Sequence, residues 1–193
     1  PNTDASLTSL SVSPGSIDFD SETLTYNNVE VPYGTSSVTV TFAAAPQATT
    51  NVPSPQTVNI VDRYGTFTVE VTAGDGVNKK TYTINFVEAL NPAKEITSFS
   101  FATPAVNGVI DEQEKTILVV VPFGTDVTNL TPTIVHTGAS ITPDSGTPQD
   151  FTSPVVYTVT AENGTTAQYT VTVTISPNTD ASLTSLSVSP GSI

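Results

Sequence analysis

Strict alternation of apolar and polar residues is the feature that most limits the fold of this chain. In the segment TFTVEVTA (residues 66–73), apolar residues alternate with threonine and glutamate. The same alternation recurs in three further segments, 38–42, 82–86 and 169–173. A period of two places the apolar side chains on one face of an extended chain. Each segment is therefore predicted to be a half-buried antiparallel strand.

Turn-forming sequences separate these predicted strands, among them SPGS, PYGT, AGDG, PFGT and AENG. Only 12% of the residues are charged, and the composition includes many Thr and Val residues together with Tyr and Phe, which favour strands over helices. The chain is predicted to be all-β. It contains no Cys, which excludes disulfides, a thiolate nucleophile and a sulfur-rich metal site.

The two halves of the chain resemble each other. VPYGT (31–35) returns as VPFGT (121–125), and VTAGDG (71–76) returns as VTAENG (159–164). The opening strands share an irregular apolar spacing of three and then two residues: Leu7, Leu10, Val12 and Ile96, Phe99, Phe101. Such a slip within a strand predicts a bulge or a change of sheet. We expect two tandem immunoglobulin-like (cadherin-like) antiparallel β-sandwich domains, residues 1–90 and 91–176.

Residues 1–17, PNTDASLTSLSVSPGSI, recur without change as residues 177–193. The second copy is predicted to be the first strand of a third domain, so that identical repeats follow one another head to tail in a longer filament. The linkers EALNPAKE and SPNTD are short and contain proline, which makes them poor flexible tethers. The alternative is that this tail adds to the sheet of a neighbouring molecule. That neighbour would first have to lose its own Leu7–Val12 strand.

The formal charge of −13 and a pI near 4.1 argue against nucleic acid or an anionic membrane as a partner. An acidic surface instead keeps copies of a protein from sticking together. No stretch approaches the ~18–20 apolar residues of a membrane helix. The polar N-terminus lacks the basic flank of a signal peptide. We expect a soluble, mature segment without membrane insertion.

Few residues are suited to catalysis. The only histidine, His136, lies in a predicted strand without a nucleophile motif nearby, and is expected to be exposed or hydrogen-bonded there. Two carboxylate clusters occupy equivalent turns: Asp18, Asp20, Glu22 and Asp111, Glu112, Glu114. Glycosidases use paired carboxylates, usually beside aromatic platforms, but Trp is absent. Calcium is the stronger alternative for Asp-x-Asp-x-Glu, although the glycine of a tight calcium loop is missing.

Other conspicuous groups have structural explanations. Lys79 and Lys80 follow the turn residues Asp75-Gly76 and are expected at a solvated hairpin tip. A Lys–Asn cross-link would need a lysine on an apolar strand face beside a buried acid, and neither lysine is predicted to lie in such a place. VPYGT and VPFGT resemble binding loops, but Tyr33 and Phe123 are predicted to cap the ends of their sandwiches. Gly34 and Gly124 would supply the positive φ of the turn. No catalytic, cofactor-binding or metal-binding residue is assigned.

The sequence resembles two groups of bacterial modules. Leu7–Tyr26, VPYGTSSVTVTF and DGVNKKTYTINF resemble the bacterial cadherin-like β-sandwich repeat. ITSFSF, VPFGTDVTNLTPTI and SGTPQDFTSPVVYTVTAENGTTAQYTVTV resemble related immunoglobulin-like repeats. This resemblance implies tandem modules of large surface adhesins, stalks or secreted enzymes, and it places Asp18–Glu22 in a turn shared with members that bind no metal.

These observations predict a non-enzymatic structural unit of an extracellular filament, stalk or adhesin on a bacterial cell surface. Its expected partners are the adjacent identical repeats. The alternative is a module that binds glycans or another cell weakly but many times.

Overall fold

The computed structural model describes residues 2–179, and within this range all regular elements are β-strands. The chain divides into two compact units, Pro1–Asn91 (domain 1) and Pro92–Ile193 (domain 2). The all-β prediction is confirmed. Within the described range no helix has the length and apolarity needed to cross a membrane. The third domain predicted from residues 177–193 depends on residues 180–193, which lie outside the described range, so it stays a prediction.

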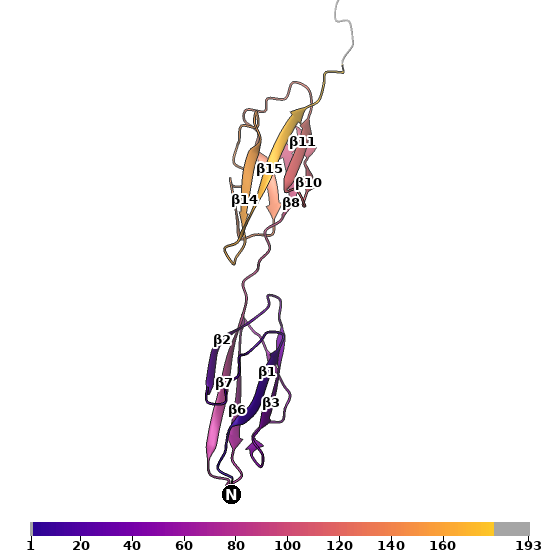
Figure 1. The fold of residues 1–193 in the computed structure, drawn as a ribbon. Coiled ribbons are helices and arrows are strands. Elements are labelled where there is room, and N and C mark those ends of the chain that lie inside the picture. Colours follow the sequence, from indigo (N-terminus) through magenta and orange to yellow (C-terminus); the bar gives the residue numbers. More distant parts are fainter. Residues whose placement is uncertain (1, 180–193) are drawn as a thin grey trace, which may run out of the picture. The chain divides into compact units, whose positions relative to one another are not determined.

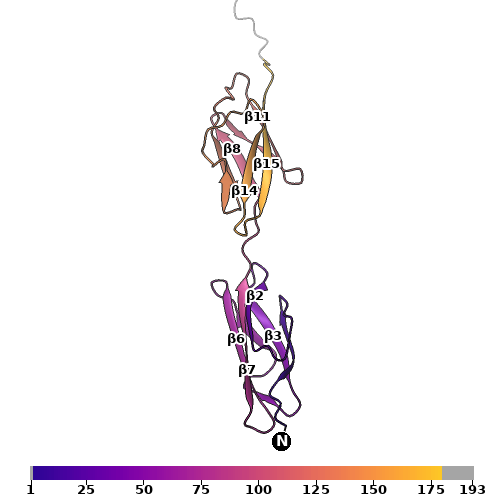
Figure 2. The same cartoon turned by 60° about the vertical axis from the view of Figure 1, so that its left-hand side comes forward.

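Domain 1 is a sandwich of two sheets, visible as two facing layers in Figures 1 and 2. The first sheet has the strand order β1 (Leu7–Ser13), β3 (Ser37–Ala44), β5 (Gln56–Asn59). The second has the order β2 (Thr25–Val31), β7 (Lys79–Glu88), β6 (Tyr64–Thr72), β4 (Thr49–Thr50). The apolar residues predicted to face inward meet between these sheets: Leu7, Leu10, Val12, Val38, Val40, Phe42, Phe67, Val69, Val71, Tyr82, Ile84 and Phe86.

Domain 2 repeats this architecture with one more strand among the described residues. Its smaller sheet has the order β12 (Pro132–His136), β8 (Ile96–Ala102), β9 (Ala105–Asn107). Its larger sheet has the order β10 (Val109–Asp111), β11 (Thr116–Val121), β15 (Thr166–Ile175), β14 (Val155–Thr160), β13 (Ser140–Thr142). The core is richer in aromatic residues, which include Phe99, Phe101, Phe151, Tyr157 and Tyr169.

The bulge predicted from the irregular apolar spacing is confirmed in both domains. Leu7 pairs with Ala44, but Ser9 already pairs with Ala43, so β1 carries one extra residue. The pairing of β8 with β12 shifts at the corresponding place, between Val135 and His136. The extra residue allows apolar side chains three positions apart to face the same core.

The strands are not all antiparallel, which corrects one detail of the prediction. β2 pairs with β7 in parallel, and β11 pairs with β15 in parallel. The first strand and the second strand of domain 1 lie in different sheets, so the chain crosses between the sheets through residues 14–24. After this crossing, β2 lies beside the last strand of the domain and runs in the same direction. Alternation within a strand carries no information about this long-range pairing.

Candidate functional site

The first carboxylate cluster forms a turn before β2. The Asp20 carboxylate accepts the backbone N–H of Glu22 at 3.0 Å and the Thr23 hydroxyl at 3.3 Å. Glu22 pairs with Lys80, with an Nζ–Oε1 distance of 3.1 Å. These carboxylate oxygens are engaged by donors from the protein itself, as in an Asx turn.

The second cluster has the same function in the turn before β11. Asp111 Oδ1 accepts the N–H groups of Gln113 and Glu114, each at 3.0 Å. Glu112 accepts the hydroxyl of Tyr169 at 2.7 and 2.8 Å, and it also contacts Lys115. Among residues 2–179, no three His, Cys, Asp or Glu side chains come together in an arrangement suited to a metal ion.

His136 differs from the sequence-based expectation. It ends β12 opposite Ile96, next to the bulge, and it is half-buried. Its Nδ1 atom is buried and finds no hydrogen-bond partner within the described range. The expectation that this histidine is exposed or hydrogen-bonded is wrong for that atom.

Lys79 and Lys80 do not lie in the hairpin turn as predicted: they are the first two residues of β7, where they pair with Thr72 and Val71 of β6. Both form surface ion pairs. Lys79 Nζ lies 2.7 Å from Glu70 Oε1 on the neighbouring strand, and Lys80 pairs with Glu22 as described above. Both are ordinary surface contacts, each contributing at most about 1 kcal/mol to stability.

The VPYGT and VPFGT loops adopt the same turn in both domains. The Thr35 N–H donates to the Pro32 carbonyl at 3.2 Å, and Thr125 does the same to Pro122 at 3.2 Å. The positive φ predicted for the glycine is confirmed, with φ of 83° at Gly34 and 80° at Gly124. These loops are therefore built by local backbone chemistry.

The aromatic residues of these loops do not cap the sandwiches as predicted. Tyr33 is 54% exposed and Phe123 is 63% exposed, and neither belongs to the buried core of its domain. The turn directs both rings away from the sheets. The capping prediction is wrong, and the rings are available for contact with another molecule.

The surroundings of the two rings differ in polarity. Next to Tyr33, domain 1 has two acidic residues, Glu30 and Glu88, and Glu88 Oε1 accepts the N–H of Gly34 at 2.5 Å. The corresponding positions beside Phe123 are Val120 and Ile175, which are about half exposed. Exposed apolar residues grouped around an aromatic ring are typical of contact surfaces.

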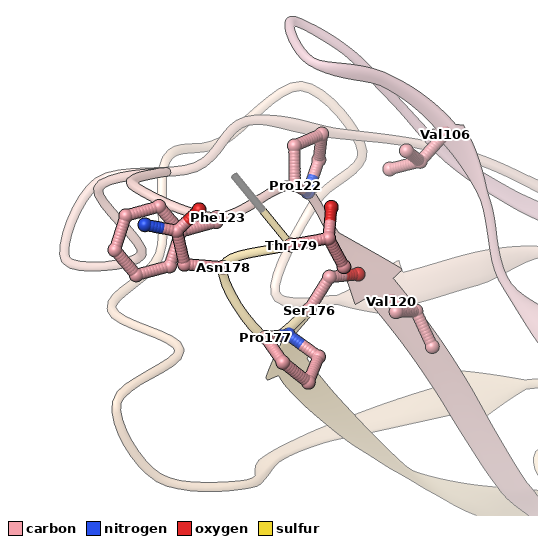
Figure 3. A pocket seen from close by; sticks show the side chains of 8 residues that line it. All are labelled: Val106, Val120, Pro122, Phe123, Ser176, Pro177, Asn178 and Thr179. Carbon is pink, nitrogen blue, oxygen red and sulfur yellow. The ribbon is translucent and has the colours of Figure 1, made fainter. Parts of the chain in front are cut away.

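Phe123 lies at a groove of about 640 Å³ in domain 2 (Figure 3). The groove is lined by residues from β9, β11, the VPFGT loop and the chain after β15: Val106, Val120, Pro122, Phe123, Ser176, Pro177, Asn178 and Thr179. None of these side chains is charged, and the polar ones are hydroxyls and an amide. Such a lining suits a neutral ligand with apolar faces and hydroxyl groups.

The apolar surface continues from the groove along the outer face of β11. Val119 and Val121 are buried, whereas Leu118 and Val120 point outward, and Leu118 pairs with the exposed Val109 of β10. We call Val109, Leu118, Val120 and Phe123 the β11 surface. Sequence reasoning missed this surface, although one signal was present: apolar residues replace Glu30 and Glu88 of the other half.

Asp126, the first acidic residue after the VPFGT loop, does not line the groove. Asp126 Oδ1 accepts the hydroxyl of Thr128 at 2.7 Å and its N–H at 2.9 Å. These hydrogen bonds lower the pKa of Asp126, because they favour the carboxylate form. The charge is thus used to hold the loop, and the groove itself remains neutral.

Comparisons with known proteins separate the two domains. Residues 7–88 match the family model of the cadherin-like beta sandwich domain. Residues 96–173 match a different model, "SGBP, N-terminal", where SGBP denotes a surface glycan-binding protein. Both models describe non-catalytic domain types. No curated protein matches the chain.

Among solved structures, the chain is similar to a candidate glycoside hydrolase from Bacteroides thetaiotaomicron. The two are 38% identical over 46% of this chain, with a TM-score of 0.40. The chain spans only 26% of the length of that protein. The chain thus combines a domain similar to cadherin-like β-sandwiches with a second domain similar to the N-terminal domain of surface glycan-binding proteins.

Proposed function

We propose that this chain is a repeating, non-catalytic segment of a bacterial cell-surface protein, in which tandem sandwiches form a stalk or filament that supports glycan binding. The observation that carries the proposal is the pairing of a cadherin-like domain with a domain similar to that of surface glycan-binding proteins. The recurrence of residues 1–17 as 177–193 supports head-to-tail repetition. In each carboxylate cluster one aspartate, Asp20 or Asp111, accepts a backbone N–H within its turn.

A second candidate function rests on the β11 surface. Here domain 2 contacts a neutral glycan directly, with the C–H face of a sugar on the Phe123 ring. Hydroxyl groups of the sugar would then reach Ser176, Asn178 and Thr179 along the groove. The chain charge of −13 disfavours an acidic polysaccharide. One such contact is weak, but repetition along a filament multiplies its effect.

Titration calorimetry of the chain with a panel of neutral oligosaccharides distinguishes the two functions. A spacer releases no binding heat with any member of the panel. Direct binding gives a saturable signal that Phe123→Ala abolishes and that the matched variant Tyr33→Ala retains. Hydrolysis of any oligosaccharide by the chain would contradict both proposals.

A further inference from the structure

Strand β1 occupies a separable site in domain 1. Among residues 2–179 it is an edge strand paired with β3 alone, and its pairing runs from Leu7 opposite Ala44 to Ser13 opposite Thr39. Leu7, Leu10 and Val12 are buried between the sheets. An edge strand can be exchanged without breaking any other strand pair of the sheet.

The residues before the strand are also held by domain 1. The Asn2 side-chain amide donates to the Pro46 carbonyl at 2.8 Å, and the Asn2 carbonyl accepts the N–H of Asp75 at 2.9 Å. The N–H of Leu7 donates to the hydroxyl of Tyr82 at 3.1 Å. The site therefore recognises residues 2–13 through both side chains and backbone, and we call it the β1 site.

A second segment of the sequence, residues 177–193, contains the same residues that the β1 site holds in β1. Because residues 177–193 repeat residues 1–17, Leu183, Leu186 and Val188 correspond to the three buried side chains of β1. The equivalent site in domain 2 is different in two ways. It is filled by the larger set Ile96, Phe99 and Phe101, and β8 is paired on both sides. The repeated segment thus matches the β1 site and does not match the site of β8.

We propose that the β1 site of domain 1 binds residues 177–193 of a second copy of this chain, which links copies by strand exchange. The resident β1 competes with the incoming strand. It is tethered through residues 14–24, and a short tether of this kind gives an effective concentration on the order of a millimolar. Exchange is therefore a minor state of the native chain. It becomes the main state when the resident strand is damaged.

Identical positions in the two segments provide matched variants of the full chain. Leu10→Asp places a charge in the core and disables the resident strand, whereas Leu186→Asp disables only the incoming strand. We expect Leu10→Asp to form concentration-dependent dimers and larger assemblies, measured by size-exclusion chromatography with light scattering. Its domain 1 should retain dispersed amide NMR signals. Leu186→Asp should remain monomeric with both domains folded.

The double variant Leu10→Asp/Leu186→Asp tests whether the tail is responsible. It should be monomeric and should lose the domain 1 signals, while those of domain 2 serve as the internal control. Two outcomes would overturn the proposal. One is that Leu10→Asp and the double variant show the same loss of domain 1 without association. The other is that Leu10→Asp keeps domain 1 folded as a monomer at every concentration, because the site is then filled from within the same chain.

Discussion

At the scale of single residues, the buried hydroxyl of Tyr157 is expected to lower the stability of domain 2. It lies at the centre of domain 2, fully buried, with its ring 5.8 Å from that of Phe99. Its hydroxyl is buried and finds no hydrogen-bond partner among the described residues. The nearby Tyr169 is different, because its hydroxyl donates to Glu112. A buried hydroxyl without a partner loses its hydration and gains nothing in exchange.

Tyr157→Phe is therefore expected to raise the free energy of unfolding of domain 2 by about 1 kcal/mol, since it removes only the unpaired hydroxyl. Tyr169→Phe is the control within the same domain. It should lower the free energy of unfolding by about 1.5–3 kcal/mol, because it breaks a hydrogen bond to a carboxylate. Urea unfolding of both variants checks the prediction, and a loss of stability in Tyr157→Phe would contradict it.

The burial of Tyr157 should also make the stability of domain 2 depend on pH in the alkaline range. Burial raises the pKa of Tyr157 from 10.0 to about 12. Between these values the unfolded chain has lost the phenol proton and the folded chain keeps it, so the folded state binds more protons. The contribution of the Tyr157 phenol proton to the free energy of unfolding of domain 2 is fully present below pH 10, and it is lost as the pH rises towards about 12.

Urea unfolding below pH 10 and at about pH 11 should thus show a smaller loss of domain 2 stability in Tyr157→Phe than in the unmodified chain. Both proteins contain the other tyrosines, so the difference between their losses of stability removes the contribution of those tyrosines. An equal loss in both would show that the Tyr157 phenol does not titrate abnormally.

At the scale of elements, β11 has two faces with different tasks. Ile117, Val119 and Val121 are buried in the core of domain 2. Leu118 and Val120 lie on the opposite face, on the β11 surface. An alternating strand normally places polar residues on its solvent side, so the outward apolar residues are unusual for a strand that serves the fold alone. They are free to serve contact with another molecule.

Neighbouring valines of β11 test this division. Val119 is 0% exposed and Val120 is 50% exposed. Val119→Ala should destabilise domain 2 by about 2 kcal/mol, because it leaves a cavity in the core. Val120→Ala should change stability by less than about 0.5 kcal/mol. Equal losses in thermal or urea unfolding would mean that the outer face also stabilises the fold.

At the scale of the whole molecule, the high acidic charge does not imply a need for cations. In domain 1 the turn before β2 is closed by Asp20, and in domain 2 the turn before β11 is closed by Asp111; each aspartate accepts a backbone N–H group. Protein donors thus perform the task that calcium performs in metal-dependent sandwiches.

Chelation is accordingly expected to leave both melting transitions in place. A bound ion that contributed about 1 kcal/mol would shift the midpoint of a domain of this size by roughly 4–8 °C on its removal. Calorimetric scans with and without a chelator provide the measurement. A downward shift of that size, reversed by added calcium, would identify a site at one of the carboxylate clusters.

The sequence by itself determined which segments become strands and which of their residues face the core. The period-two pattern predicted β3, β6, β7 and β15, and the irregular spacing of Leu7, Leu10 and Val12 predicted a bulge or a change of sheet, of which the structure shows the bulge. Matching VPYGT with VPFGT predicted the same turn in both halves, including its glycine φ. These properties are local, because a strand pattern or a tight turn depends on residues a few positions apart.

Only the tertiary structure decided features that depend on distant segments. The parallel pairing of β2 with β7 and of β11 with β15 follows from where the chain crosses between sheets. The exposure of Phe123, and the absence of a partner for the Tyr157 hydroxyl within residues 2–179, depend on which side chains other strands place around them. An aromatic residue looks the same in the sequence whether it fills a core or faces solvent. Burial is a property of the space around a side chain, and long-range packing creates that space.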